Sequence, residues 1–252
     1  MGRYDEALAD LNRAIELDPD DAGAFGRRGE MYWQLGRYDE ALADLSRAIE
    51  LDPDDAGAFG RRGETYIALG NYDEALADLN RAIELDPAKA WAIGSRGAWT
   101  VGGRGEVYRQ LGRYDEALAD LNRAIRIDPA EALLFTCRGE TYRLMDRFDE
   151  ALADFNRAIE LCPGHAWTIG TRGQTYLAMG RLDEALADLS RAIELDPSLD
   201  WAIGRRGETY LETVRYDEAL SDLSRAIELN PSLDWAIVAR GRAYRELSLI
   251  HI

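Results

Sequence analysis

The stretch AGAFGRRGEMYWQLGRYDEALADLSRAIELDPDD, residues 22–55, decides the fold, because most of the chain repeats it. Copies of its segment GRYDEALADL, some of them altered, begin at Gly2, Gly36, Gly70, Gly112, Asp146, Gly180 and Val214. Successive copies start 34 residues apart, except for one step of 42. A fixed period of this length indicates a repeat architecture, which grows by adding units and not by enlarging one core.

Each unit contains two amphipathic segments. With Ala22 counted as position 1, apolar residues recur at helical spacing over positions 4 to 14, and Gly36 then interrupts the pattern. Positions 17 to 30 carry a wider apolar stripe that can pack against two neighbours, and Asp52-Pro53 ends it. The unit is therefore predicted to be a helix A, a tight turn and a helix B, and the fold class to be an all-α solenoid of antiparallel helix pairs.

Small residues recur where two helices have to approach each other. Position 8 is glycine in every unit, and positions 20 and 27 are alanine. Glycine costs about 1 kcal/mol in a helix interior, so we expect close packing against helix B to compensate at position 8. All 12 tyrosines stand at position 11 or 17. We expect these aromatic rings to fill the space that glycine and alanine leave.

On these residues the chain resembles the tetratricopeptide repeat family, whose pattern has Gly at position 8, Tyr at 11, Ala at 20 and 27, and Pro at 32. The resemblance covers roughly residues 2–247. It implies a right-handed superhelix with an inner groove lined mainly by helix A, and a role in holding protein or peptide partners. One departure is position 7, usually leucine in the family and arginine in every unit here. We expect each of these arginines to pair with the aspartate at position 23, as in Asp44 and Asp78.

The repeat makes residues 1–247 a single solenoid. We assign a helix B at 4–18, repeats at 22–55, 56–89, 90–131, 132–165, 166–199 and 200–233, and a final helix A at 234–247. Residues 248–252 form a tail outside the pattern.

The third repeat carries an eight-residue insertion near residues 94–101, where a Gly-x-Arg-Gly frame occurs twice. Eight residues turn a helix by about 800°, so the two frames face different directions. We expect the second frame, with Tyr108 and Leu111, to pack, and Gly102-Gly103 to bend or break the helix.

The two ends of the repeat array are incomplete, since the first helix B has no helix A and the last helix A has no helix B. One interpretation is that the chain is a fragment of a longer protein. The other is a self-associating module that stacks head to tail, with the last helix A of one chain and the first helix B of the next completing a unit.

The composition is acidic, with 47 acidic against 30 basic residues and a net charge of −17. This balance disfavours nucleic acid and anionic membrane surfaces as partners. Neither a signal peptide nor an apolar run of membrane-spanning length occurs, and Cys137 and Cys162 are too few for a disulfide framework. We therefore expect a reduced, cytoplasmic setting.

The sequence contains no catalytic constellation, so we expect no enzymatic activity and no cofactor. The Asp-Glu pairs recur at the start of every helix B, where they suit the helix dipole and do not form a unique acid–base pair. Of the two histidines, His165 lies three residues from Cys162 but far from Cys137. This spacing does not predict a metal site.

What remains as a candidate site is the groove face of helix A, where the resemblance places positions 2, 5, 9, 12 and 13. The candidate groove residues are Glu30, Trp33, Glu64, Trp91, Glu106, Arg109, Glu140, Arg143, Trp167, Gln174, Trp201, Glu208, Trp235 and Arg242. Glycine at position 5 beside tryptophan at position 2 predicts shallow pockets with aromatic rims, and the glutamates predict a basic or amine-bearing segment as partner. The alternative is that the tryptophans only seal the seam between successive units.

Overall fold

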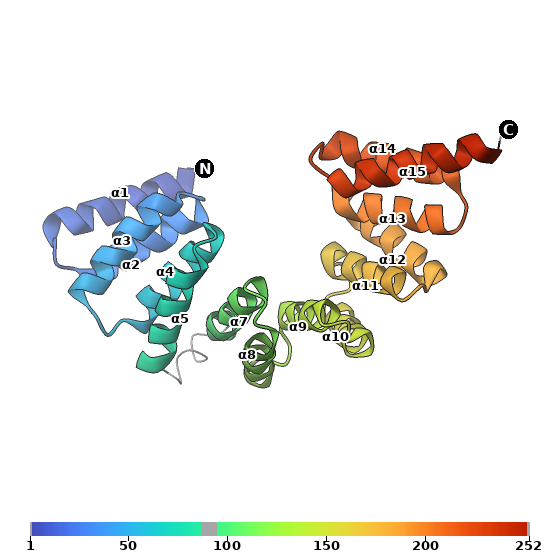
Figure 1. Ribbon diagram of the computed structural model, residues 1–252. Helices are drawn as coiled ribbons and strands as arrows, with labels where there is room; N and C mark the ends of the chain where they lie inside the picture. Colours follow the sequence, from blue (N-terminus) through green and yellow to red (C-terminus); the bar gives the residue numbers. More distant parts are fainter. Residues whose placement is uncertain (1, 87–94, 251–252) are drawn as a thin grey trace. The chain divides into compact units, whose positions relative to one another are not determined.

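The computed structural model describes residues 2–86 and 95–250 (Figure 1). All regular secondary structure in these residues is α-helical, which confirms the all-α fold class. The chain divides into two compact units, an N-terminal unit Met1–Pro129 and a C-terminal unit Ala130–Ile252.

The helices of the N-terminal unit are α1 (Gly2–Leu17), α2 (Ala22–Gln34), α3 (Tyr38–Leu51), α4 (Ala56–Ala68), α5 (Tyr72–Leu85), α7 (Ser95–Gln110) and α8 (Tyr114–Ile127). The helices of the C-terminal unit are α9 (Ala132–Leu144), α10 (Phe148–Leu161), α11 (Ala166–Ala178), α12 (Leu182–Leu195), α13 (Asp200–Glu212), α14 (Tyr216–Leu229) and α15 (Asp234–Ile250). The predicted helix B at the N-terminus is α1, and every later described pair follows the predicted order of helix A and helix B.

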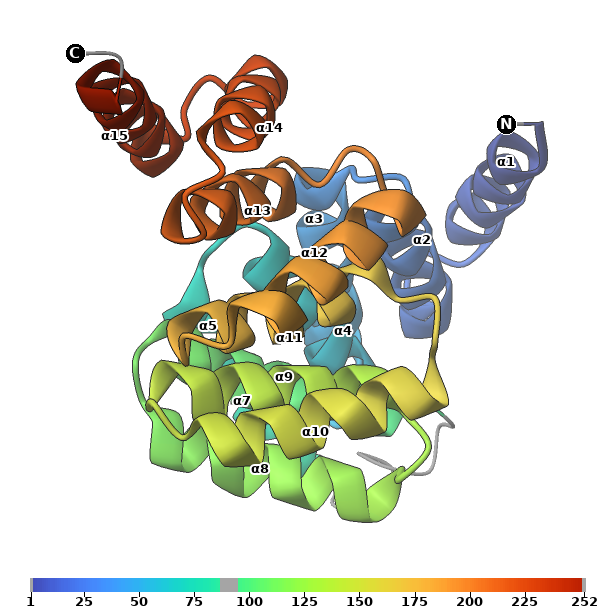
Figure 2. The same ribbon diagram turned by 90° about the vertical axis from the view of Figure 1, so that its right-hand side faces the viewer.

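The turn from each helix A to its helix B contains a residue with positive φ. Gly36 has φ 71°, its amide donates to the carbonyl of Trp33, and the amide of Arg37 donates to the carbonyl of Tyr32. These bonds satisfy carbonyl groups that the end of a helix leaves without partners. The turn sends helix B back antiparallel to helix A, as α9 and α10 illustrate (Figures 1 and 2).

Packing within a pair depends on the glycine at position 8. A Cβ placed on Gly29 would lie 2.8 Å from Cγ of Leu45, and one on Gly139 would lie 2.8 Å from the ring of Phe155. The close approach of helix B is therefore confirmed. The residue that fills the space is the one at position 24, a leucine in most units, and not a tyrosine as the sequence predicted. Leucine fits because its branched end reaches over the bare backbone of helix A.

The third repeat packs through its second Gly-x-Arg-Gly frame, as predicted. A Cβ on Gly105 would meet Cγ of Leu121 at 3.0 Å, the contact that every other described pair makes. Of the bend or break predicted at Gly102-Gly103, the break is wrong, because α7 runs through both glycines without interruption. The backbone hydrogen bonds of neighbouring turns can hold two glycines in a helix when flanking residues pack, as Val107 does here.

The last helix also differs from the expected boundary. α15 begins at Asp234 as predicted but continues to Ile250, into the segment that the sequence assigned to a tail. No glycine or proline stands between 242 and 250 to end the helix.

Neighbouring helices A lie against each other within each unit. In the C-terminal unit α9 contacts α11, α11 contacts α13, and α13 contacts α15. Each helix B of this unit also packs against the next helix A, α10 on α11, α12 on α13 and α14 on α15. In the C-terminal unit, side chains of α9, α11, α13 and α15 line a hollow beside these contacts, and this face carries the candidate site.

Candidate functional site

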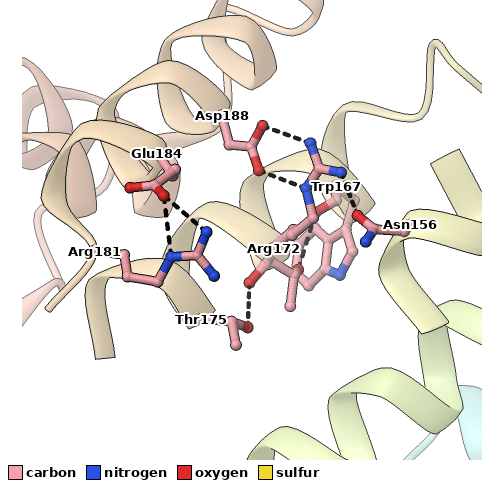
Figure 3. Close-up of polar contacts among 8 residues, drawn as sticks. Asn156, Trp167, Arg172, Thr175, Arg181, Glu184 and Asp188 are labelled. Carbon is pink, nitrogen blue, oxygen red and sulfur yellow. Dashed lines mark hydrogen bonds and ion pairs between the residues drawn. The ribbon is translucent and has the colours of Figure 1, made fainter. Parts of the chain in front are cut away.

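The arginine at position 7 can hold three helices together, as Arg172 does in the C-terminal unit. In Figure 3, Nε and Nη2 of Arg172 donate to the two carboxylate oxygens of Asp188 at 2.6 and 2.8 Å. Its Nη1 donates to Asn156 of the preceding helix B at 2.6 Å. The hydrogen bonds to the carboxylate raise the pKa of Arg172, against the effect of burial. The arginine therefore stays charged while it joins α11 to α12 and α10.

The predicted ladder of ion pairs is confirmed in six units. The shortest distances between guanidinium and carboxylate are 2.6 Å in every one: Arg28–Asp44, Arg62–Asp78, Arg104–Asp120, Arg138–Asp154, Arg172–Asp188 and Arg206–Asp222. These pairs lie inside the helix stack, so we assign them a structural role and place the binding site elsewhere.

A second arginine lies on the outer surface of every turn between helix A and helix B except the α4–α5 turn, which has Asn71. Arg181 donates from Nε and Nη2 to Oε1 of Glu184 (Figure 3). Its guanidinium lies 4.5 Å from the ring centroid of Tyr176. These hydrogen bonds lower the pKa of Glu184. Since the pair is exposed to water, it contributes local order at the start of α12 and little binding capacity.

The uncovered faces of α9, α11, α13 and α15 enclose a concavity of about 680 Å³, here called the C-terminal concavity. Its lining residues are Arg143, Gln174, Leu177, Ala178, Arg205, Glu208, Leu211, Glu212, Asp234, Trp235, Val238, Ala239 and Arg242. Five of these belong to the predicted groove residues: Arg143, Gln174, Glu208, Trp235 and Arg242.

The floor of the C-terminal concavity is apolar and its charges are balanced. Val238 is 73 % exposed there, although it is a large apolar side chain. Arg205 donates to Glu208 at 2.6 Å and lies 4.1 Å from the ring centroid of Trp235. Arg242 of α15 pairs with Glu212 of α13 at 3.0 Å. Four of the charged groups that line the concavity are thus joined in two ion pairs.

Trp201 and Trp235, at position 2, cover the glycines at position 5 of the preceding helix A and fill the space over them. A Cβ on Gly170 would lie 2.8 Å from Cη2 of Trp201, and one on Gly204 would lie 2.5 Å from Cη2 of Trp235. The space directly over these two glycines is therefore filled, although Trp235 also lines the C-terminal concavity. Each indole bridges from one helix A to the previous one, where its flat ring needs a surface without side chains.

Trp167 behaves differently from the other two tryptophans. Its preceding helix carries Thr136 at position 5, and the indole is 47 % exposed. The indole Nε1 donates to Glu140 at 2.9 Å, and the ring meets that of Trp201 edge to face with centroids 5.0 Å apart. Threonine leaves no bare backbone for the indole to cover, so the ring lies nearer to solvent.

The N-terminal unit gathers its predicted groove residues around Arg61. This arginine pairs with Glu30 of α2 at 3.0 Å and with Glu64 of its own helix. Its guanidinium lies 5.0 Å from the ring centroid of Trp33, whose buried Nε1 has no hydrogen-bond partner among the described residues.

Three predicted groove residues of this unit remain. Glu106 and Arg109 pair with each other along α7. Trp91 lies outside the described residues.

The sequence did not single out the arginine at position 6, which organises both faces. Arg61 and Arg205 each stand three residues before a glutamate and next to a tryptophan in space. The spacing of three was visible in the sequence as a helical ion pair. The contact with tryptophan was not, because Trp33 and Trp235 belong to neighbouring repeats.

Among the residues that the structure describes, no group of three or more Cys, His, Asp or Glu side chains could hold a metal ion. In that same part of the chain, no helix combines the length and apolarity that a membrane span requires.

Comparison with known proteins identifies the repeat. A family model described as tetratricopeptide repeat matches residues 1–56 and 171–234, and a second model of the same description matches 54–130 and 128–198. No curated protein matches the sequence.

Solved structures with the same fold cover almost the whole chain. A chain in the crystal structure of the APC/C hetero-tetramer Cut9-Hcn1 has a TM-score of 0.83 at 18% identity over 96% of this chain, which spans only 46% of that one. A tetratricopeptide repeat protein from Parabacteroides merdae has a TM-score of 0.73 at 19% identity, with 96% and 93% covered. PilF from Pseudomonas aeruginosa has a TM-score of 0.72 at 18% identity, with 89% and 97% covered. At these identities the likeness shows the fold alone.

Proposed function

Since this chain belongs to the tetratricopeptide repeat family, we propose that it is a scaffold that binds a protein or peptide segment in the C-terminal concavity. The family is typically made of non-enzymatic scaffolds. Within that general role, the binding surface is the C-terminal concavity and the contacts are mainly apolar.

The observation that carries this proposal is an apolar surface that stays uncovered inside a concave, charged frame. Leu177, Leu211 and Val238 from three successive helices line the same hollow, and of these Val238 is exposed, Leu177 half-buried and Leu211 buried. A volume of several hundred Å³ is in the range that takes a few side chains of a ligand. Apolar contact at the centre with polar groups at the rim is the usual anatomy of a protein interface.

The charges favour an amphipathic partner more than a strongly basic one. Each glutamate of the predicted row already bonds within the chain: Glu30 and Glu64 with Arg61, Glu106 with Arg109, Glu140 with Trp167, and Glu208 with Arg205. A basic ligand would have to displace those partners. The expected basic segment therefore remains a prediction with weaker support, and we propose that apolar side chains supply most of the affinity.

Selection of peptides on the whole chain tests the proposal. Peptides enriched from a displayed library should bind the variant Val238→Asp at least about tenfold more weakly, because the new carboxylate stands in the apolar centre. Val214→Asp is the matched control, since Val214 is also an exposed valine but lies in the α13–α14 turn, outside the concavity. Equal affinity for both variants, or no enriched peptide, would contradict this function.

A second candidate function is head-to-tail self-association of the 252-residue chain. One observation favours it: α15 and α1 expose the faces that every complete pair buries between helix A and helix B. Association of this kind would use the ends of the helix stack and leave the C-terminal concavity open.

A further inference from the structure

Two tryptophans of this chain have an arginine over the ring. The guanidinium of Arg205 lies 4.1 Å from the ring centroid of Trp235. That of Arg61 lies 5.0 Å from the ring centroid of Trp33. Both arginines also pair with the glutamate at position 9 of their own helix. Since the face of an indole attracts a cation, tryptophan, arginine and glutamate form one arrangement that the chain contains twice.

Trp167 has the tryptophan and the glutamate of this arrangement, but its preceding helix A does not supply the arginine. The glutamate at position 9 of that helix is Glu140, whose Oε1 accepts a hydrogen bond from Nε1 of Trp167 at 2.9 Å. Position 6 of the same helix is Cys137, whereas Arg205 stands at position 6 before Trp235. A thiol cannot supply the cation that Arg205 supplies to Trp235.

The indole of Trp167 is held in place and accessible at the same time. Trp167 is 47 % exposed, whereas Trp201 and Trp235 are half-buried. Its ring meets that of Trp201 edge to face with centroids 5.0 Å apart, and this contact engages at most one of its two faces. The hydrogen bond to Glu140 fixes the ring from a second direction. At least one face of this exposed indole therefore lies outside the contact with Trp201.

We propose that this face of Trp167 binds the guanidinium of an arginine in a protein or peptide partner. The partner's arginine takes the role that Arg205 has on Trp235. A carboxylate can accept about four hydrogen bonds, so Glu140 can receive the guanidinium while it keeps the indole. The net charge of −17 favours the approach of a cationic side chain. Arginine suits the site better than lysine, because its planar and weakly hydrated guanidinium stacks on aromatic faces.

The Trp167 site is separate from the C-terminal concavity, since neither Glu140 nor Trp167 nor Trp201 lines that hollow. The inference therefore goes beyond the proposed function and does not depend on it. Val238→Asp, which tests the concavity, should leave the binding of arginine at Trp167 unchanged.

Titration of the whole chain, followed by nuclear magnetic resonance of the indole N–H groups, tests the proposal. The probe is Nα-acetyl-arginine methylamide, and the variant Trp167→Phe identifies the signal of Trp167. This signal should shift with the probe until it saturates. The citrulline counterpart of the probe has a similar shape without the charge and should bind at least about threefold more weakly. The lysine counterpart should also bind more weakly than the arginine probe.

Trp235 is the matched control within the same molecule. Its indole signal should not respond in the wild type, because Arg205 already lies over the ring. In Arg205→Ala the ring is uncovered, and its signal should begin to respond to the probe. Cys137→Arg should have the converse effect, because it places a guanidinium at position 6 before Trp167. It should weaken binding of the probe there at least about threefold, and its spectrum shows at once whether the fold is intact.

The results decide the proposal in either direction. No shift at Trp167, or an equal affinity for the citrulline counterpart, overturns it. A response of Trp235 in Arg205→Ala without a response of Trp167 in the wild type also overturns it, because the face of Trp167 is then closed to a guanidinium that an open indole can bind. Tighter binding of the trimethyllysine counterpart overturns the assignment of arginine as the occupant.

Discussion

The individual residue that departs most from the family pattern is the arginine at position 7. Arg172 and Asp188 form a bidentate pair within the helix stack, with the carboxylate only 7 % exposed. Removing water from both charges costs much of what their attraction returns, so such a pair adds little net stability. Loss of one partner is costly, because the other charge then remains without a counterion. The pair therefore fixes which surfaces of α11 and α12 meet.

Asp188→Ala should lower the free energy of unfolding by about 3 kcal/mol, because Nε and Nη2 of Arg172 lose their acceptors. The double variant Arg172→Leu/Asp188→Ala should recover at least half of this loss, since leucine is the usual residue of the family at position 7. Urea denaturation monitored by circular dichroism measures both values. The control Asp183→Ala removes an exposed aspartate of the same helix and should cost only a few tenths of a kcal/mol. A double variant as unstable as the single one would refute this account.

Val214 is strained, since it stands at φ 61° where four other turns have glycine. The left-handed region costs an L-residue roughly 1–2 kcal/mol, and glycine returns about 0.5–1 kcal/mol of that as chain entropy. Val214→Gly should therefore stabilise the chain by about 1 kcal/mol in thermal or urea unfolding, with little lost contact because the side chain is 64 % exposed. The converse change Gly180→Val, at φ 72°, should destabilise by a similar amount. If both changes act in the same direction, strain is not the cause.

At the scale of the helix pair, the glycine at position 8 sets how closely two helices approach. A Cβ on Gly207 would lie 2.8 Å from Cγ of Leu223 and 3.3 Å from the carbonyl oxygen of Ala219. The carbonyl oxygen belongs to the backbone and cannot turn away. Substitution must therefore separate α13 from α14.

Gly207→Ala should destabilise the chain by about 1–3 kcal/mol, because overpacking outweighs the better helix propensity of alanine. Gly241→Ala is the matched control at the same position of the repeat, and it should be neutral or stabilise by up to about 1 kcal/mol. Denaturant unfolding of both variants compares the cost of overpacking with the gain in helix propensity. Equal effects of the two substitutions would show that propensity alone decides the outcome.

The seam between helices A differs between the two units. Trp235 covers Gly204 and stacks on Arg205, whereas Gly57 stands at the equivalent position of α4 and leaves Gly26 of α2 half-buried. In the N-terminal unit, a Cβ on Gly26 would meet only Ala48, at 3.9 Å. The space that an indole ring fills over Gly204 is therefore empty over Gly26.

Gly57→Trp should stabilise the chain by about 1 kcal/mol, because the indole can bury Gly26 and lie against the exposed Arg27. The control Gly57→Ala gains helix propensity without a ring. Thermal unfolding should place the tryptophan variant above the alanine variant. A tryptophan variant no more stable than the alanine variant would show that Asp55, whose carboxylate oxygen lies 3.1 Å from the new Cβ, prevents the fit.

At the scale of the whole molecule, stability comes from neighbouring helices, as in other repeat proteins. The C-terminal unit has its own apolar clusters, one around Ile203 and one around Leu223. The helices of the C-terminal unit thus have apolar packing of their own.

A fragment of residues 130–252 should consequently be helical and unfold cooperatively by far-ultraviolet circular dichroism. A fragment of residues 148–252 lacks α9 and exposes Ala151 and Phe155, which are fully buried in the whole chain. It should melt at a lower temperature than the longer fragment. An unfolded 130–252 fragment would show that the unit depends on the rest of the chain.

The sequence by itself determined the helix pairs, most of their boundaries and the ladder of ion pairs. These features depend on residues close in sequence or at a fixed spacing, such as Arg172 and Asp188 sixteen positions apart, so the period of 34 residues reveals them. The same logic located the packing frame of the third repeat at Gly105. It failed at Gly102-Gly103 because helix continuity there depends on the packing of neighbouring turns and not on local propensity.

Only the tertiary structure decided the use of the surface. Whether Trp201 lines a pocket or seals a seam depends on Gly170 of another helix. Whether Glu30 and Glu208 are available to a ligand depends on their ion pairs with Arg61 and Arg205. Most of these contacts join side chains of different repeats. The spacing of residues within one repeat does not define how successive repeats are rotated relative to each other. The sequence therefore identified the helix face that carries the candidate site, and the packing of successive helices decided which of its residues remain open to a partner.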